Sequence, residues 1–194
     1  DRWWQSHPYS LSAGPDPRYL RITVKDLGDH SRGLAALRPG TRVVAEGPYG
    51  TFTAKARRTD RVVLVAGGVG IAPVRALLDD IPAYVEVEVL YRAPRAEALV
   101  LREELEAIAR RRPGVRLRYL VGSRRDYPID ARTLTHLVPW FASGDVYTCG
   151  PDALVESVRE AAHVLGMPDE RVHDDSFSFQ SPDYYSFSAQ GGTR

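Results

Sequence analysis

Cysteine, long apolar runs and an excess of either charge are all scarce in this sequence. One cysteine among 194 residues permits no intrachain disulfide and excludes a thiolate-held metal or iron–sulfur cluster built by this chain alone. No apolar run approaches the roughly 18 residues of a membrane-spanning helix. The 26 basic and 25 acidic residues leave a net charge of +1, which argues against nucleic acid as a main partner. A lone thiol suits a reducing compartment, so we expect a cytoplasmic location.

What is present is ordinary globular composition, with 43% apolar and 26% charged residues over a length that fits one large domain or two small ones. In the second part of the chain, short β-branched runs alternate with helical ones. The expected strands are residues 62–66, 85–91, 115–121 and 146–149, and the expected helices are residues 73–79, 97–111, 130–138 and 152–165. This alternation predicts an α/β domain, a doubly wound parallel sheet covered on both faces.

The helix predictions depend on the spacing of apolar residues. In the second expected helix, Leu101, Leu105 and Ile108 recur at i, i+4 and i+7, which places them on one face. The last expected helix is followed by Gly166 and Pro168, a common way for a helix to end. These signals indicate amphipathic helices packed on a sheet.

Residues 1–57 have a different pattern. The expected strands are residues 8–11, 20–24 and 42–46, separated by glycine, proline and aspartate turns and by one short helix at 31–37. Three strands make a poor independent core, so we expect part of an antiparallel domain whose earlier strands precede this chain. Exposed strand edges would favour domain swapping or another oligomer. Residues 180–194 have little periodicity and are expected to form a flexible tail.

A glycine-rich loop links the first expected strand of the α/β part to its helix. It runs Ala66-Gly67-Gly68-Val69-Gly70-Ile71-Ala72-Pro73, with the proline expected at the first helical position. Glycines allow the backbone to approach a pyrophosphate closely, and a helix N-terminus offers free N–H groups. The last residue of this G-x-G-x-x-P pattern differs from the usual dinucleotide-binding pattern. The loop is therefore a candidate pyrophosphate site, the alternative being a tight turn that binds nothing.

Two other strand ends carry polar residues at the same predicted edge of the sheet. Thr148-Cys149-Gly150-Pro151 places a thiol where ligands of open α/β sheets bind, although a lone cysteine is often only a small buried residue. Val121-Gly122-Ser123-Arg124-Arg125 offers a hydroxyl beside a guanidinium, which suits a phosphate monoester; a solvated loop is the alternative. His136 and His163 are isolated, so no metal site is expected.

Three short segments near the N-terminus complete the set of motifs. They are His7-Pro8-Tyr9-Ser10, Gly28-Asp29-His30-Ser31 and Gly47-Pro48-Tyr49-Gly50-Thr51-Phe52. Alone, each would be a strand or turn with polar residues. Taken in order with the two nucleotide loops, they resemble the motifs of the ferredoxin–NADP reductase superfamily, in the form of bacterial ferric reductase-like and NADPH oxidase-like dehydrogenase regions. The resemblance spans about residues 3–179.

The resemblance implies two domains. Residues 1–57 would be part of an FAD-binding antiparallel β-barrel, and residues 58–179 an NADP-binding domain whose fifth parallel strand is residues 172–179. In that strand Asp175 stands where the family often has a glutamate, and the family's terminal aromatic would be Phe177 or Phe179.

The resemblance also implies roles for individual residues. Tyr9 would lie against the flavin ring with the Ser10 hydroxyl near its N5 atom, and Cys149 would border the nicotinamide. Ser10, Cys149 and Asp175 are thus the candidate catalytic residues. The implied FAD-binding residues are His7, Pro8, Tyr9, Ser10, Gly28, Asp29, His30, Ser31, Gly47, Gly50 and Phe179. The implied NADPH-binding residues are Gly67, Gly68, Val69, Gly70 and Pro73 at the pyrophosphate, Ser123 and Arg124 at the 2′-phosphate, and Cys149, Gly150 and Pro151 in the second nucleotide motif.

The function implied by the resemblance is that of a flavin-dependent oxidoreductase, which passes hydride from NADPH to FAD and then single electrons to an acceptor. Haem, ferric iron, ferredoxin and oxygen are all compatible with this sequence as the acceptor. A haem-bearing membrane segment or a separate redox protein is the expected partner, and the former would place this domain at the cytoplasmic face of the membrane. The alternative is a nucleotide-binding interaction module without redox activity.

Overall fold

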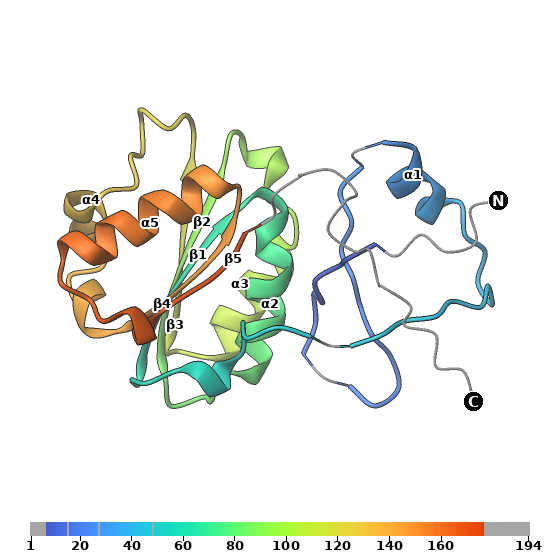
Figure 1. The fold of residues 1–194 in the computed structure, drawn as a ribbon, viewed down its shortest axis with the longest axis horizontal. Helices are drawn as coiled ribbons and strands as arrows, with labels where there is room; N and C mark the ends of the chain where they lie inside the picture. The colour runs from blue at the N-terminus through green and yellow to red at the C-terminus, as the bar shows by residue number, and fades with distance from the viewer. Residues whose placement is uncertain (1–6, 15, 27, 48, 177–194) are drawn as a thin grey trace, which may run out of the picture.

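The computed structural model describes residues 7–14, 16–26, 28–47 and 49–176. Figure 1 shows a central sheet with helices on both faces and, beyond helices α2 and α3, an N-terminal region with little regular structure. The expected tail at 180–194, Phe177, Phe179 and the side chains of Asp29 and His30 lie outside the described residues. Within the described part, no helix is long and apolar enough to span a membrane.

Five strands form one sheet in residues 61–176, which we call the sheet domain. The strands are β1 (Arg61–Gly67), β2 (Glu86–Ala93), β3 (Val115–Val121), β4 (Asp145–Gly150) and β5 (Val172–Ser176). All neighbouring strands are parallel, and their order is β3-β2-β1-β4-β5. The central strand β1 is a nearly continuous apolar run, as expected for a strand covered on both faces. The predicted five-stranded parallel sheet is confirmed.

Helices cover both faces of the sheet and divide its side chains into two cores. The covering helices are α2 (Ile71–Asp80), α3 (Arg102–Arg111), α4 (Ala131–Leu137) and α5 (Asp152–Val164), whereas α1 (Asp29–Ala35) lies in the N-terminal region. Short 3-10 turns are η1 (Ala54–Ala56), η2 (Gly68–Gly70), η3 (Ala96–Ala98), η4 (Phe141–Ser143) and η5 (Asp169–Arg171). Val62 and Leu64 of β1 face α2 and α3, whereas Val63 and Val65 face α4 and α5. This alternation follows from the period of two in a strand.

Two helices of the sheet domain start two or more residues away from the predicted position. The predicted helix at 97–111 is interrupted, because Leu101 adopts a left-handed conformation with φ of 58° and α3 begins only at Arg102. Periodicity does not detect such a break, since Leu101 still packs against the core on the expected side. Pro73 is the third residue of α2 rather than the first. It is tolerated there because N–H groups of the first turn have no partner within a helix.

The N-terminal region, residues 7–57 where described, has far less structure than predicted. Leu11 and Ile22, from two of the expected strands, form one isolated antiparallel bridge, next to a hydrogen bond from the Ser12 amide to the Arg21 carbonyl of 2.8 Å. The predicted strand at 42–46 is wrong, because these residues pair with no other described strand. Helix α1 confirms the predicted short helix, with a shift of two residues. A β-barrel is therefore not formed by the described residues.

Ion pairs connect the N-terminal region to the sheet domain. Arg21 donates to both carboxylate oxygens of Glu104 in α3, at 3.0 and 2.9 Å, and Arg75 of α2 donates to the same carboxylate at 3.1 Å. Arg75 also bonds Asp79 at 2.6 Å, and the Asp79 carboxylate accepts the Gly14 amide at 2.9 Å. We call these five residues the interdomain network. It joins α2 and α3, which cover one face of the sheet, to Gly14 and Arg21.

Candidate nucleotide-binding site

The two predicted nucleotide loops meet at the carboxyl edge of the sheet. The last residues of β1 and β4 are in register, with Ala66 opposite Cys149. A Cβ atom placed on Gly70 would lie 2.2 Å from the Cys149 carbonyl oxygen, and one placed on Gly67 would lie 2.6 Å from the Leu154 side chain. No larger residue fits at either position without a shift of the backbone or of Leu154. The two loops are therefore packed directly against each other, as the prediction of a shared edge requires.

The outer surface of the glycine loop remains open. Gly68 has φ of +58°, and no atom lies within 4 Å of the position its Cβ would take. The loop then passes through η2 directly into α2, a helix of ten residues whose N-terminus has no side-chain cap. Open backbone at the N-terminus of a helix that has no side-chain cap is the arrangement that holds phosphate groups. The residues present therefore fit the pyrophosphate of a dinucleotide.

Tyr91 supports the loop from below. Its hydroxyl lies 3.4 Å from the carbonyl oxygens of Gly68 and Ala98, and its ring is completely buried in β2. Burial raises the pKa of Tyr91 to about 12, so the hydroxyl keeps its proton at neutral pH and can donate to these carbonyls. This contact connects the glycine loop to the buried side chain of β2.

Cys149 and Asp175 lie on neighbouring strands in register. The Cys149 thiol is completely buried, and burial, together with the nearby Asp175 and Asp174 carboxylates, raises its pKa. It therefore stays protonated and does not act as a thiolate nucleophile. Burial, and then the charge of Asp174, also raise the pKa of Asp175. The structure thus brings two candidate catalytic residues together, with the thiol in the same core as Tyr91.

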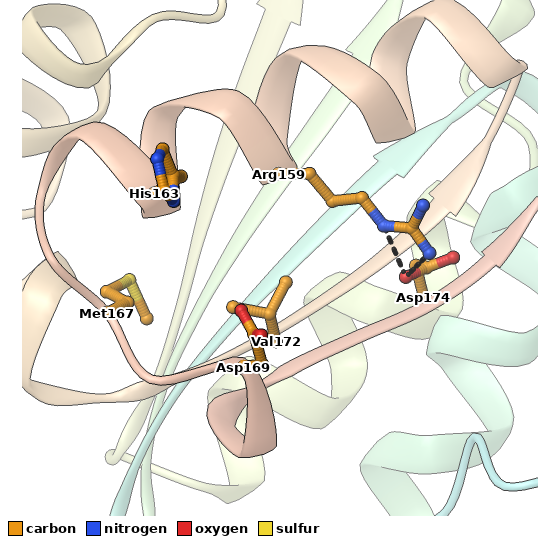
Figure 2. Close-up of a pocket in the computed structure, with 6 residues that line it drawn as sticks. All are labelled: Arg159, His163, Met167, Asp169, Val172 and Asp174. Carbon is orange, nitrogen blue, oxygen red and sulfur yellow. Dashed lines mark hydrogen bonds and ion pairs between the residues drawn. The ribbon is translucent and has the colours of Figure 1, made fainter.

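A measurable cavity lies elsewhere, on the outer side of α5 and β5. Figure 2 shows its lining by Arg159, His163, Met167, Asp169, Val172 and Asp174, and its volume is about 390 Å³. The Arg159 guanidinium donates to Asp174 at 2.9 and 2.6 Å, so the only arginine in this lining is already neutralised. None of the residues predicted to hold a cofactor lines this cavity, and we do not assign it a ligand.

The predicted phosphate loop follows β3 at the same carboxyl edge. Ser123 is held within its own turn, because its amide donates to Asp126 at 2.8 Å and its hydroxyl oxygen accepts the amides of Arg125 and Asp126 at 3.2 and 3.3 Å. Arg124 is exposed beside it. The residues of this loop therefore lie at the predicted edge. The Ser123 hydroxyl, however, is already hydrogen-bonded within the turn, which the sequence did not predict.

Sequence reasoning missed Arg92, the residue of β2 that lies opposite Gly67 of β1. Its Nη2 atom is buried and has no hydrogen-bond partner among the described residues. The signal was an arginine near the end of an otherwise apolar strand, where a small or apolar residue is the norm. Asp126 was missed as well, since its role depends on the geometry of the turn.

The predicted flavin residues are distributed over the N-terminal region. His7, Pro8 and Tyr9 are exposed and Ser10 is half-buried, just before the Leu11 bridge. The Ser31 hydroxyl donates to the Gly28 carbonyl at 2.9 Å, at the start of α1. Of the third segment, Tyr49 is largely exposed, whereas Phe52 contacts Tyr147 of the sheet domain edge-on, with ring centroids 5.4 Å apart. The described β structure does not join these segments into one site.

Comparison with known proteins agrees with the architecture. The family described as "Oxidoreductase NAD-binding domain" matches residues 64–160, half of the chain. The fold is similar to that of the Amycolatopsis cytochrome P450 reductase GcoB, with a TM-score of 0.71 and 24% identity, over 87% of this chain and 55% of that one. At this identity the similarity shows the fold alone.

Curated relatives extend the match beyond the sheet domain. Ferredoxin–NADP reductase B of Sorangium cellulosum is 34% identical over 185 residues, which cover 85% of this chain and 75% of that protein. The flavohemoprotein of Bordetella pertussis is 29% identical over 193 residues, and this chain spans about half of its length (48%). Since the family model matches half of the chain and the Sorangium reductase is 34% identical with 75% of its length covered, the chain belongs to the ferredoxin–NADP reductase superfamily and is an oxidoreductase of that superfamily.

Proposed function

We propose that this chain is the nucleotide-binding domain of an NADPH-dependent flavin reductase, together with the adjoining part of its FAD-binding domain. The observation that carries the proposal is the carboxyl edge of the sheet. There the loops that follow β1 and β4 pack against each other, and the surface of Gly68 stays accessible beside the N-terminus of α2. The named relatives support the same cofactors, because they include a ferredoxin–NADP reductase and a flavohemoprotein.

Within this proposal the residues of the sheet domain bind and orient NADPH. The Gly67–Gly70 backbone and the first turn of α2 hold the pyrophosphate, and the end of β3 with Arg124 holds the 2′-phosphate. Cys149, protonated and buried, limits the nicotinamide position from the sheet side without forming a covalent bond. Asp175, whose pKa is raised, lies in register with Cys149 on β5 and can carry a proton there.

The N-terminal region is proposed to hold FAD when its domain is complete. Tyr9 and Ser10 would contact the flavin ring, and His7 and Ser31 would contact the FAD pyrophosphate. FAD, when bound, supplies the chemistry that converts a two-electron hydride into single electrons. The role of this region is to bring that ring to the edge carrying Cys149 and to exclude water from between the rings.

The electron acceptor is proposed to be a haem or a metal centre of a partner protein or of a further segment of the protein. Several similar proteins are named as reductase subunits, among them the glycine betaine monooxygenase reductase subunit of Chromohalobacter salexigens, and others are flavohemoproteins. A haem-bearing membrane segment remains part of this proposal, with this domain at the cytoplasmic face. Each acceptor takes electrons one at a time, which is the step a flavin permits.

Nucleotide and flavin titrations test the proposal on the chain itself. We expect the chain to bind NADPH, and a chain supplied with FAD to lose its yellow absorbance when NADPH is added without oxygen. NADPH binding without any bleaching, also in a longer chain carrying the preceding strands, would favour a nucleotide-binding module without redox activity. No binding of either NADPH or NADH would overturn the proposed site.

A further inference from the structure

Arg92 occupies an unusual position in the sheet. It is the second-last residue of β2, aligned with Gly67 of β1 on one side and Leu120 of β3 on the other. It is two residues beyond the buried Leu90, so its side chain leaves the sheet on the face covered by α4 and α5. The backbone of the next residue, Ala93, accepts the Gly122 amide at 3.0 Å. Arg92 therefore lies at the floor of the loop that carries Ser123 and Arg124.

The guanidinium of Arg92 differs from other arginines of the same sheet. Arg116 and Arg118 of β3 both bond the buried Glu88 carboxylate, at 2.9 and 2.5 Å. Arg112 also buries a nitrogen without a partner, but its other nitrogens bond the carbonyls of Leu78 and Pro82. In the described part of the chain, Arg92 forms no hydrogen bond or ion pair of this kind. A buried charged donor without a partner destabilises the folded chain unless a ligand supplies an acceptor.

The charges around Arg92 point to an anion. Burial lowers the pKa of Arg92, and the nearby charge of Arg124 lowers it further, so its electrostatic neighbour is another cation. The two carboxylates of the loop between β3 and α4 are bonded elsewhere, since Asp126 accepts the Ser123 amide and Asp130 accepts the Thr133 amide. Ser123 is itself used within the turn. Arg124 follows β3 two residues after Gly122, whose amide bonds the residue next to Arg92, and its charge acts on Arg92. Like charges at one end of neighbouring strands are stabilised by a phosphate dianion.

We propose that Arg92 and Arg124 together bind the 2′-phosphate of the nucleotide, with Arg92 at the floor of the site and Arg124 at its rim. The proposal rests on the proposed NADPH function and names the residue that determines its selectivity. Arginine presents paired N–H donors that match two phosphate oxygens, so two arginines satisfy a monoester from two sides. Selectivity against NADH is therefore set at the end of β2 as well as in the loop after β3.

The test compares two small probes, 2′-phospho-AMP and AMP, by titration calorimetry on the 194-residue chain. Arg92→Gln should weaken binding of 2′-phospho-AMP by about 10- to 150-fold, the range for one charge-assisted contact, and leave AMP binding nearly unchanged. Arg124→Gln should have a similar selective effect, and the double variant should lose the preference for 2′-phospho-AMP. Arg61→Gln, a strand arginine at the opposite edge that pairs with Glu86, is the matched control and should affect neither probe.

Several outcomes would overturn the proposal. Unchanged binding of 2′-phospho-AMP by Arg92→Gln would remove Arg92 from the site, and equal weakening of both probes would give it a structural role only. If the unaltered chain bound both probes equally, the NADPH assignment would fail together with this proposal. If Arg92→Gln does not fold, Arg92→Lys replaces it. Lysine keeps the charge without the paired donors, so Arg92→Lys should weaken 2′-phospho-AMP binding several-fold and leave AMP binding unchanged. An unchanged preference for 2′-phospho-AMP over AMP would contradict the proposal that both arginines bind the phosphate.

Discussion

The sheet domain and the N-terminal region bury their apolar side chains to very different degrees. In the sheet domain the side chains of Val62–Ala66 are completely buried, whereas Val43, Val44 and Tyr49 of the N-terminal region are mostly or fully exposed. The reason lies in how each kind of sheet is completed. A β-α-β unit covers its own strands with helices that are close in sequence, but a strand of an antiparallel barrel needs partners on both edges. The sheet domain therefore covers its own strands, whereas the described residues of the N-terminal region leave large apolar side chains exposed.

The largest expected difference comes from truncating one apolar side chain in each region to alanine. Phe141→Ala, which empties a fully buried site between the sheet and α4, should lower the free energy of unfolding by about 3–5 kcal/mol. Val44→Ala should change it by less than about 0.5 kcal/mol, because Val44 is fully exposed. Denaturant unfolding followed by circular dichroism measures both. Similar losses for the two variants would show that the N-terminal region is part of the same cooperative core.

A pair of glycine substitutions should give effects of opposite sign. Gly70→Ala places a Cβ 2.2 Å from the Cys149 carbonyl oxygen, and the resulting backbone shift should lower the free energy of unfolding by about 1–3 kcal/mol and weaken nucleotide binding. Gly33→Ala, in α1 with no atom within 4 Å, should raise it by about 0.5–1 kcal/mol, since alanine is the better helix former. Thermal unfolding and calorimetry measure the two effects. A neutral Gly70→Ala would contradict the tight contact between the two loops.

Asp145 joins the linker between the regions to the sheet, and its pH dependence should reveal this. Burial opposes ionisation of Asp145, but hydrogen bonds from His173 and Thr59 and from the backbone amides of Arg58 and Thr59 outweigh it and lower its pKa. A carboxyl group whose pKa is lower in the folded state stabilises the fold above its unfolded pKa, and that stability is lost as the pH falls through the folded value.

Asp145→Asn should therefore lower the free energy of unfolding at neutral pH by about 1.5–3 kcal/mol, the range for hydrogen bonds to a charged group, and should make stability less sensitive to acid. Asp60→Asn is the control, because the Asp60 carboxylate is exposed and its ion pair with Arg57 should be worth less than about 1 kcal/mol. Unfolding curves recorded from neutral to acidic pH distinguish the two. If the free energy of unfolding fell equally steeply with acid in Asp145→Asn and in the unaltered chain, the proposed stabilisation by ionised Asp145 would be contradicted.

The smallest expected effect on stability, and the most local one, concerns the interdomain network. Glu104→Gln removes the carboxylate shared by Arg21 and Arg75 and should cost about 1 kcal/mol or less. It should nevertheless speed hydrogen exchange at residues 11–22, because their docking on α3 depends on that carboxylate. Glu106→Gln, in the same helix, breaks an ion pair with Arg102 of α3 and should leave hydrogen exchange at residues 11–22 unchanged. Equal exchange in both variants would show that the network does not hold the N-terminal region.

Much of the sheet domain could be predicted because its signals are local. The apolar run of β1, the glycine turn and the helix of α5 are each specified by neighbouring residues, and their observed bounds lie within about two residues of the predictions. Leu101 was the exception, because a single left-handed residue leaves the apolar period intact. The strand predicted at 42–46 failed for a different reason, since strand formation depends on a partner that sequence pattern does not supply.

The candidate site could be predicted only in outline. The carboxyl edge and its glycine loops follow from strand–helix alternation, but the state of each polar group depends on residues distant in sequence. Ser123 is engaged by Asp126 through the shape of one turn. The missing partner of Arg92 is visible only once β1 and β3 lie on either side of it. Whether Tyr9, Ser10 and Ser31 hold FAD stays a prediction, as does the boundary between the domains near residue 57.

The contact between Gly70 and Cys149 has a consequence for synthesis on the ribosome. The chain emerges from its N-terminus, so β1, α2, β2 and β3 are available long before β4. Until Cys149 and Gly150 emerge, the glycine loop lacks the backbone against which it packs, and one edge of β1 has no partner strand. A nascent chain ending before β4 should therefore bind no nucleotide and present an open strand edge. In the growing chain, cofactor recruitment follows the arrival of the fourth strand.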